Sequence, residues 1–267
     1  MSTFCERLDA VTAVRGRLCV GIDPHEKLIR GWGYDYDLNG LERLSRTMVE
    51  ALGDIVPVFK PQSAFFEAFG APGMRVLAQV LADIADVGAL SILDVKRGDI
   101  GSTMAAYAHA YLSGRTDLSA DAITVSPFLG FDSLAPALEL AVANDRGLYV
   151  LARTSNPEGF AVQTALRDGV SVAQEIVNRA MQANFEAGTD FVGLVIGATH
   201  QHLDVDLTGF GGSILAPGIG VQGGTVDTLR KLFGEVAGNT LPSVSRQVIS
   251  AGPLGESLRN AVAALMV

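Results

Sequence analysis

The sequence is poor in cysteine, in aromatic residues and in positive charge, and each shortage excludes a class of protein. Only two cysteines, Cys5 and Cys19, occur in 267 residues. Both lie close to the N-terminus, where a disulfide between them would do little to stabilise so long a chain, so we expect free thiols. Aromatic residues make up 7%, which disfavours an aromatic-rich sandwich. The net charge of −9 disfavours nucleic-acid binding, which needs a basic face, but leaves room for a small anionic ligand.

Long apolar runs are also absent. The longest uncharged stretch, residues 207–226, holds seven glycines and one proline and therefore predicts loop and strand rather than a membrane span. The N-terminus shows no basic region followed by an apolar one, which is the pattern of a secretory signal. We therefore expect a cytoplasmic protein that contacts neither membrane nor nucleic acid.

Hydrophobic residues make up 48% of the chain and charged residues 18%, as expected of a protein with a sizeable core. Short apolar runs alternate with stretches of helical period. Strands are expected at 18–23, 56–60, 90–96, 122–126, 148–153, 191–197, 213–217 and 243–249. Helices are expected near 40–52, 73–87, 100–113, 132–144, 170–187, 225–236 and 254–266, and segment 25–37 is expected to be a long loop over the mouth.

This alternation predicts an α/β protein made of parallel βαβ units. Eight strands in a chain of this length favour a (β/α)8 TIM barrel, formed by residues 1–267 as a single domain. An open doubly wound sheet is the alternative fold. It is disfavoured because no Gly-x-Gly-x-x-Gly follows the first strand.

The third expected strand carries the sharpest chemical signal. Side chains two residues apart share a strand face, so Asp94 and Lys96 point the same way, and Asp99 follows on the loop. A lysine between carboxylates keeps its proton, which suits a general acid better than a Schiff-base nucleophile. The simpler interpretation is a charged cluster that only caps the barrel.

Two more strand ends are charged. Lys60 ends the second strand and Asp23 ends the first. Because the carboxyl ends of barrel strands meet at one mouth, these side chains join Asp94 and Lys96 there. The signs of the four alternate, as they would in a mutually satisfied network.

A glycine-rich loop follows the seventh strand. Its glycines let backbone N–H groups approach an anion closely, and barrel enzymes often bind phosphate at this position. Gln222 can add its side-chain amide beside Gly223, and Arg246, expected on the eighth strand, can complete the site with a fork of donors. These features predict a small phosphorylated substrate, with a mobile linking loop as the simpler alternative.

The pattern Asp94-x-Lys96-x-x-Asp99-Ile100-x-x-Thr103 resembles the D-x-K-x-x-D-I-x-x-T signature of the orotidine 5′-phosphate decarboxylase family. The lysine at the end of strand 2, the Ser-Asn-Pro loop after strand 5 and the loop Pro-Gly-Ile-Gly-Val-Gln-Gly-Gly follow in the family's order. The resemblance extends over strands 1 to 8 and is greatest to the longer bacterial subgroup.

The resemblance implies a lyase of pyrimidine (UMP) biosynthesis that converts orotidine 5′-phosphate to UMP without cofactor or metal. It implies that Lys96 protonates C6 and that Asp94 lies near the substrate carboxylate. It also implies a homodimer with shared active sites. The remaining implied roles are ribose binding by Asp23 and Lys60, ring contact by Ser155, phosphate binding by Gln222 and Arg246, and contributions from the partner subunit by Asp99 and Thr103.

Three other functions remain open at this point. A metal-dependent sugar-phosphate decarboxylase shares D-x-K-x-x-D but is expected to carry an acid where this chain has Lys60. His200 and His202 lack a clear third metal ligand. A Schiff-base aldolase needs a lysine of depressed pKa, the opposite of the environment expected for Lys96. The third alternative is a barrel that binds a nucleotide or phosphate without turnover.

Overall fold

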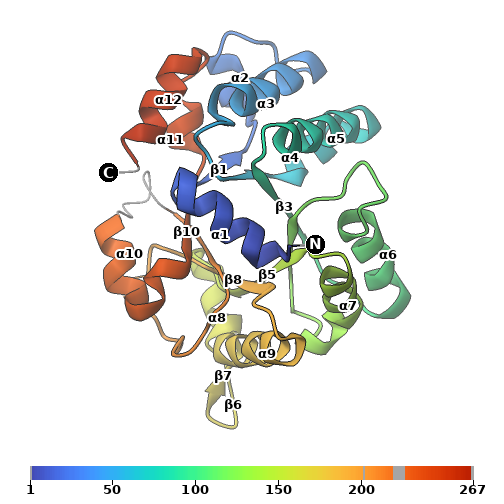
Figure 1. Ribbon diagram of the computed structural model, residues 1–267, viewed down its shortest axis with the longest axis vertical. Helices are drawn as coiled ribbons and strands as arrows, with labels where there is room; N and C mark the ends of the chain where they lie inside the picture. Colours follow the sequence, from blue (N-terminus) through green and yellow to red (C-terminus); the bar gives the residue numbers. More distant parts are fainter. Residues whose placement is uncertain (1, 201, 219–225, 266–267) are drawn as a thin grey trace.

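The computed structural model describes residues 2–200, 202–218 and 226–265, and within them eight parallel strands close into a barrel (Figure 1). Around the barrel the strands follow the order β1-β10-β9-β8-β5-β4-β3-β2. Closure is completed where the first strand pairs with the last, at Cys19 and Ser243. The strands are β1 (Cys19–Ile22), β2 (Val58–Pro61), β3 (Leu90–Arg97), β4 (Ala122–Val125), β5 (Gly147–Arg153), β8 (Val192–Ile196), β9 (Ile214–Pro217) and β10 (Thr240–Val244). The predicted (β/α)8 architecture is confirmed, and the open-sheet alternative is wrong.

Helices surround this barrel and bury their apolar faces against it (Figure 1). The longer helices that follow the barrel strands are α3 (Leu38–Leu52), α5 (Gly70–Asp86), α6 (Gly101–Leu112), α7 (Ala135–Ala143), α9 (Val172–Ala187), α10 (Val226–Phe233) and α12 (Gly255–Ala263), all near their expected positions. Local sequence explains their ends. Asp37 caps α3 by accepting a hydrogen bond from Gly40 N at 2.8 Å, and α9 ends at Gly188, whose φ of 65° favours glycine.

Shorter elements fill the connections. They are α2 (Glu26–Gly31), α4 (Ser63–Glu67), α8 (Phe160–Gln163), α11 (Arg246–Ile249), the 3-10 helices η1 (Phe131–Leu134), η2 (Pro157–Gly159) and η3 (Gly234–Asn239), and the hairpin strands β6 (Leu166–Arg167) and β7 (Val170–Ser171). The sequence did not predict them, because one or two turns carry too little periodicity to stand out.

Two expectations from the sequence are wrong here. Segment 25–37 is not one long loop: it begins with α2, and its Trp32 is 6% exposed and donates from Nε1 to the carbonyl of Ile249 at 2.7 Å. The last strand ends at Val244 rather than at residue 249, and Arg246 begins α11. Val248 and Ile249 are fully buried, and a short buried helix has the same apolar pattern as a strand.

An unpredicted helix, α1 (Phe4–Arg15), lies across the end of the barrel where the strands begin (Figure 1). Phe4 and Leu8 are each 3% exposed, and the Phe4 ring packs edge-on against Tyr149 at 6.3 Å between centroids. The helix therefore plugs the N-terminal end of the barrel and leaves the opposite end for ligands.

The carboxylate of Asp121 holds α1 against the barrel. Asp121 accepts hydrogen bonds from Arg7 of α1, from Arg146 at 3.2 Å and from the backbone N–H of Ser91 at 3.0 Å. We expect Asp121→Ala to lower the free energy of unfolding by about 2–3 kcal/mol, because the buried N–H of Ser91 and two half-buried arginine side chains lose their acceptor. Urea denaturation measures this, with the exposed Asp117→Ala as the control; equal unfolding midpoints for the two variants would contradict the assignment.

Candidate active site

Asp94, near the end of β3, is the centre of a polar cluster at the mouth of the barrel. Its Oδ2 lies 3.0 Å from Lys60 Nζ and accepts from Gln62 Nε2 at 2.8 Å. Its Oδ1 lies 2.6 Å from Lys96 Nζ and accepts from Thr124 Oγ1 at 2.8 Å. Both carboxylate oxygens are thus fully used, and the geometry holds two ammonium groups on opposite sides of one anion.

The buried members of this cluster have strongly shifted pKa values. Asp94 is 6% and Lys60 is 7% exposed. Burial alone would raise the pKa of Asp94, but the positive charges of Lys60 and Lys96 outweigh it and hold this pKa far below its usual range. Burial alone would lower the pKa of Lys60, but Asp94 and Asp23 outweigh it and raise this pKa above its usual value. Both groups are therefore charged at neutral pH.

Lys96 reaches the cluster through an unusual backbone. Its φ is 44°, in the left-handed region that few non-glycine residues adopt, and the pairing of β3 with β4 shifts register between Leu93 and Arg97. Its N–H donates to Thr124 Oγ1 at 2.9 Å, which stabilises this conformation. The Lys96 side chain is 48% exposed, so its ammonium group is fixed by Asp94 on one side and open to a ligand on the other.

Asp23 is not bonded into the cluster as predicted. Among the described residues it forms no ion pair with Lys60, and its buried Oδ1 has no hydrogen-bond partner. The buried Ser245 Oγ likewise has no hydrogen-bond partner within the part of the chain that the structure describes. A Cβ placed on Gly21 would lie 3.2 Å from Ser245 Oγ and 3.3 Å from Asp23 Oδ1, so both atoms converge above this glycine. Unmatched buried polar groups at a barrel mouth are typical of a ligand site.

A cavity of about 490 Å³ opens in front of these groups, within the usual size range of ligand pockets. Asp23, Gln62, Asp94 and Lys96 line it, together with residues of α4. The cavity thus lies at the ends of the first three strands and includes the predicted site residues Asp23, Asp94 and Lys96.

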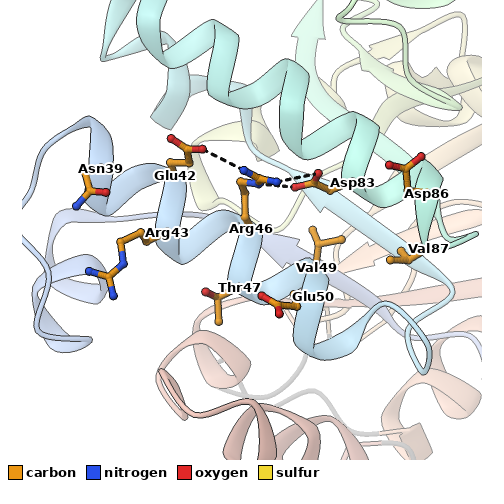
Figure 2. Close-up of a pocket in the computed structure, with 10 residues that line it drawn as sticks. All are labelled: Asn39, Glu42, Arg43, Arg46, Thr47, Val49, Glu50, Asp83, Asp86 and Val87. Atoms are coloured by element: carbon orange, nitrogen blue, oxygen red, sulfur yellow. Dashed lines mark hydrogen bonds and ion pairs between the residues drawn. The ribbon is translucent and has the colours of Figure 1, made fainter.

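A larger groove of about 560 Å³ lies outside the barrel, between α3 and α5 (Figure 2). Its central charge, Arg46, is already paired with Glu42 at 3.2 Å and with Asp83 at 2.7 Å. The groove lies away from the strand ends, and these ion pairs link two helices. Its charges therefore serve helix packing, and the barrel mouth is the better candidate site.

The other predicted site residues are placed as follows. Asp99 is half-buried, accepts from Ile100 N at 2.8 Å and, within the described part of one subunit, forms no ion pair with Lys96. Thr103 is exposed in the first turn of α6. Ser155 lies over the end of β8, where a Cβ on Gly197 would approach Ser155 Cβ to 2.7 Å.

Arg246 is exposed at the start of α11, directly after β10. It is therefore at the mouth as expected, although on a helix rather than a strand. Gln222 and Gly223 lie outside the described residues. In the part of the chain that the structure describes, no three His, Cys, Asp or Glu side chains are grouped to hold a metal, and no helix is long and apolar enough to cross a bilayer.

Sequence reasoning missed Gln62, Thr124 and Ser245. Gln62 follows β2 by one residue and pairs with Asp94 through an isolated bridge, which only the sheet register shows. Thr124 stands in an apolar run of β4, where threonine is common for packing reasons alone. A single sequence carries no signal that distinguishes these three residues from ordinary polar positions.

Fold and cluster together define a class: a (β/α)8 barrel enzyme with a Lys–Asp–Lys cluster at its mouth. The family model described as "Orotidine 5'-phosphate decarboxylase / HUMPS family" matches residues 16–261. The chain belongs to this family, as the sequence resemblance predicted.

Individual relatives agree with this assignment. The chain is 51% identical to the orotidine 5′-phosphate decarboxylase of Salinispora tropica over 263 residues, which cover 98% of this chain and 95% of the relative. It is 46% identical to that of Corynebacterium glutamicum over 268 residues, covering 98% and 95%. A crystal structure from Streptomyces avermitilis assigned to orotidine 5′-phosphate decarboxylase has 48% identity and a TM-score of 0.94, covering 100% and 94%. Leishmania donovani OMP decarboxylase has 27% identity and a TM-score of 0.77, covering 99% and 98%.

Proposed function

We propose that this chain decarboxylates orotidine 5′-phosphate to UMP and carbon dioxide, with Lys96 as the proton donor. It is a carboxy-lyase of pyrimidine biosynthesis. The observation that carries the proposal is the ammonium group of Lys96, held 2.6 Å from the buried carboxylate of Asp94 at the edge of the cavity. The family membership supplies the substrate class, and the charged cluster supplies the chemistry.

The reaction needs a positive charge where a carbanion forms. When the bond between C6 and the carboxylate breaks, its electron pair stays on C6, where no adjacent carbonyl delocalises it as an enolate. An ammonium fixed beforehand beside C6 stabilises this charge without reorganisation. Lys96 Nζ then transfers a proton to C6, becomes a neutral amine and regains its proton from water.

Asp94 fixes this ammonium and lies next to the substrate carboxylate. Its four partners hold it ionised and immobile, so the Lys96 side chain keeps one orientation at the edge of the cavity. Lys60 and Asp23 bind the ribose hydroxyls. The unpaired Oδ1 of Asp23 is an acceptor that such a hydroxyl would satisfy.

The substrate's ring and phosphate lie further around the mouth. Ser155, at the end of β5, contacts the pyrimidine ring. Arg246 binds the phosphate together with Gln222 and the backbone of Gly223. The start of α11 directly after β10 supports this assignment, because it presents the Arg246 side chain at the end of the barrel where ligands bind.

The proposed assembly is a homodimer with shared active sites. Asp99 and Thr103 of one subunit complete the site of the other. Ile100 between them is 63% exposed, and Phe128 and Leu129 after β4 are 77% and 52% exposed. Exposed apolar side chains on the segments that follow β3 and β4, two neighbouring strands of the barrel, suit a surface that a second subunit covers.

A direct assay tests the activity. Adding orotidine 5′-phosphate to the purified protein should lower the pyrimidine absorbance, and chromatography should recover UMP in equal amount to the substrate consumed. Stable substrate in the presence of folded protein would contradict the proposal and favour a barrel that binds the nucleotide without turnover.

The phosphate site gives a separate prediction. We expect Arg246→Ala to raise KM by about 10- to 150-fold, the equivalent of ~1.5–3 kcal/mol for a charge-assisted hydrogen-bonding fork. Phosphite added with the phosphate-free nucleoside should restore part of the turnover in the unmodified enzyme. The exposed neighbour Gln247 supplies the control variant Gln247→Ala. Unchanged kinetics of Arg246→Ala would show that another residue binds the phosphate.

A further inference from the structure

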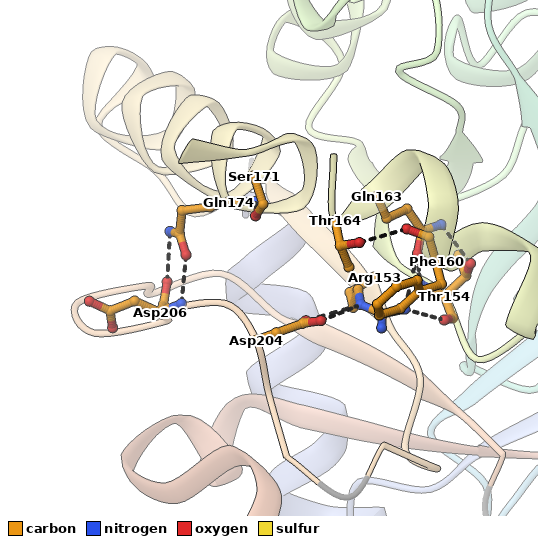
Figure 3. Close-up of polar contacts among 9 residues, drawn as sticks. All are labelled: Arg153, Thr154, Phe160, Gln163, Thr164, Ser171, Gln174, Asp204 and Asp206. Carbon is orange, nitrogen blue, oxygen red and sulfur yellow. Dashed lines mark hydrogen bonds and ion pairs between the residues drawn. The ribbon is translucent and has the colours of Figure 1, made fainter. Parts of the chain in front are cut away.

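The last residue of β5, Arg153, is a buried charge to which the proposed chemistry gives no role. It is 6% exposed, and arginine is among the residues least often buried. Its Nε donates to both carboxylate oxygens of Asp204, at 3.0 and 3.1 Å, and its guanidinium carbon lies 5.6 Å from the centre of the Phe160 ring (Figure 3). This ion pair makes Asp204 the counter-ion of Arg153.

The same side chain organises Thr154, the residue before Ser155. Arg153 Nη1 donates to the carbonyl of Thr154 at 3.3 Å and to Gln163 Oε1 at 3.4 Å. Gln163 Oε1 accepts from Thr154 N at 3.0 Å, and Gln163 Nε2 donates to Thr154 Oγ1 at 2.7 Å (Figure 3). Every polar group of Thr154 is therefore bonded to Arg153 or Gln163, which fixes its backbone.

Asp204 is itself held in place from the other side. It lies on the connection between β8 and β9, and two residues later Asp206 is fastened to α9. Gln174 Oε1 accepts from Asp206 N at 2.6 Å, and Gln174 Nε2 donates to Asp206 O at 3.1 Å (Figure 3). The carboxylate of Asp204 is thus presented to Arg153 by a connection anchored to the outer helix layer.

These contacts fix the position of the neighbouring residue, Ser155. Gly197 N donates to the carbonyl of Arg153 at 2.8 Å, and a Cβ on Gly197 would approach Ser155 N to 2.8 Å. The Ser155 backbone therefore rests directly on the end of β8, immediately after the residue that Arg153 and Gln163 hold. A shift of the Arg153 guanidinium would move Thr154, and with it the Ser155 hydroxyl.

We propose that Arg153 and Asp204 are positioning residues that hold the Ser155 hydroxyl against the substrate's pyrimidine ring. The inference rests on the proposed function of Ser155. Arginine is needed at position 153 because one planar group must reach Asp204, Thr154 and Gln163 at once, which the single ammonium of a lysine does not do.

A double-mutant cycle tests this. Asp204→Ala should lower kcat/KM for orotidine 5′-phosphate by about tenfold, mainly through KM, since it acts on a contact with bound substrate. In a Ser155→Ala background the same substitution should change kcat/KM by less than about twofold, because the hydroxyl that it displaces is gone. Arg153→Lys should behave like Asp204→Ala. Asp206→Ala is the matched control, because among the described residues its exposed carboxylate bonds only to Thr208, whose N–H donates to it at 2.9 Å.

The outcomes are distinct. A purely structural role would reduce the fraction of folded enzyme, which lowers kcat and leaves KM unchanged; that result, or additive effects in the cycle, would overturn the proposal. So would a Ser155→Ala enzyme with unchanged kinetics. Thermal melting of each variant separates lost folding from lost positioning. The unmodified enzyme's turnover of orotidine 5′-phosphate tests the proposed function independently, because the cycle is interpreted only against that rate.

Discussion

Lys96→Ala is expected to lower kcat by about 10⁴-fold or more. A positioned general acid contributes about 10²–10⁴-fold and a preorganised charge about 10²–10³-fold, and this substitution removes both. The fold should survive, because Asp94 keeps Lys60, Gln62 and Thr124 as partners and therefore remains compensated. Single-turnover measurement with orotidine 5′-phosphate gives the rate of the chemical step directly.

Binding provides the control for this prediction. The phosphate contacts lie away from β3, so the Kd of UMP should change by less than about tenfold, or about 1.4 kcal/mol. Lys27→Ala, which removes an exposed lysine from α2, should leave both rate and affinity unchanged. Substantial residual decarboxylation by Lys96→Ala would mean that another group protonates C6.

Asp99→Ala should also be nearly inactive, but through the neighbouring subunit. Mixing inactive Lys96→Ala and Asp99→Ala dimers and letting their subunits exchange should restore about a quarter of the unmodified activity at equal mixing. Half of the dimers are then hybrids, and each hybrid has one site with neither substitution and one with both. The observation behind this prediction is that Asp99 forms no ion pair with Lys96 within the described part of one subunit.

Subunit exchange must be shown separately, by forming hybrids between differently tagged subunits. If hybrids form and no activity returns, Asp99 does not act across the interface, and the shared-site part of the proposal is wrong. Mixing Lys96→Ala with Asp94→Ala is the matched control, because Asp94 and Lys96 belong to the same subunit's cluster. In those hybrids one site lacks Lys96 and the other lacks Asp94, because neither residue crosses the interface, so no activity should return.

Strand periodicity was enough to predict that Asp94, Lys96 and Lys60 lie together at the mouth of the barrel. Asp94 and Lys96 are two residues apart on β3, and period two alone places both on one face. Lys60 is predicted by the same argument, since it ends the neighbouring strand in the barrel. These predictions succeed because strand ends converge at one mouth whatever the details of packing.

Other parts of the site depend on the register between strands, which a single sequence does not contain. The contact of Thr124 with Asp94 follows from the pairing of β3 with β4, and that of Gln62 from an isolated bridge. The left-handed backbone of Lys96 arises at the register shift. The sequence does not predict it, because the residue is neither glycine nor asparagine, the types that most often adopt this conformation. Asp23 was expected to pair with Lys60 because alternating signs suggest a closed network. The structure leaves its Oδ1 free among the described residues, as a ligand contact would require.

The sequence predicted the outer helices but not α1, because only the outer helices have a clear apolar pattern. The long outer helices have a full apolar stripe and were found, whereas α1 buries only Phe4, Leu8 and Thr12 and has no such stripe. Arg246 was placed on a strand because the apolar residues that follow it continue the run of β10. Tertiary packing decides there, since Val248 and Ile249 belong to the hydrophobic cluster shared with the outer helices, and α11 contacts α12.

Decarboxylation of orotidine 5′-phosphate after removal of metal is the sharpest test of whether the Lys96 ammonium acts without a metal ion. Lys60 stands where a sugar-phosphate decarboxylase of this fold would need an acidic metal ligand, and it is already paired with Asp94 at 3.0 Å. We therefore predict that protein treated with EDTA and exchanged into metal-free buffer keeps its full rate of absorbance loss, and that added magnesium changes nothing. Loss of activity on EDTA treatment with recovery on adding magnesium would contradict metal-free decarboxylation and assign the protein to metal-dependent chemistry.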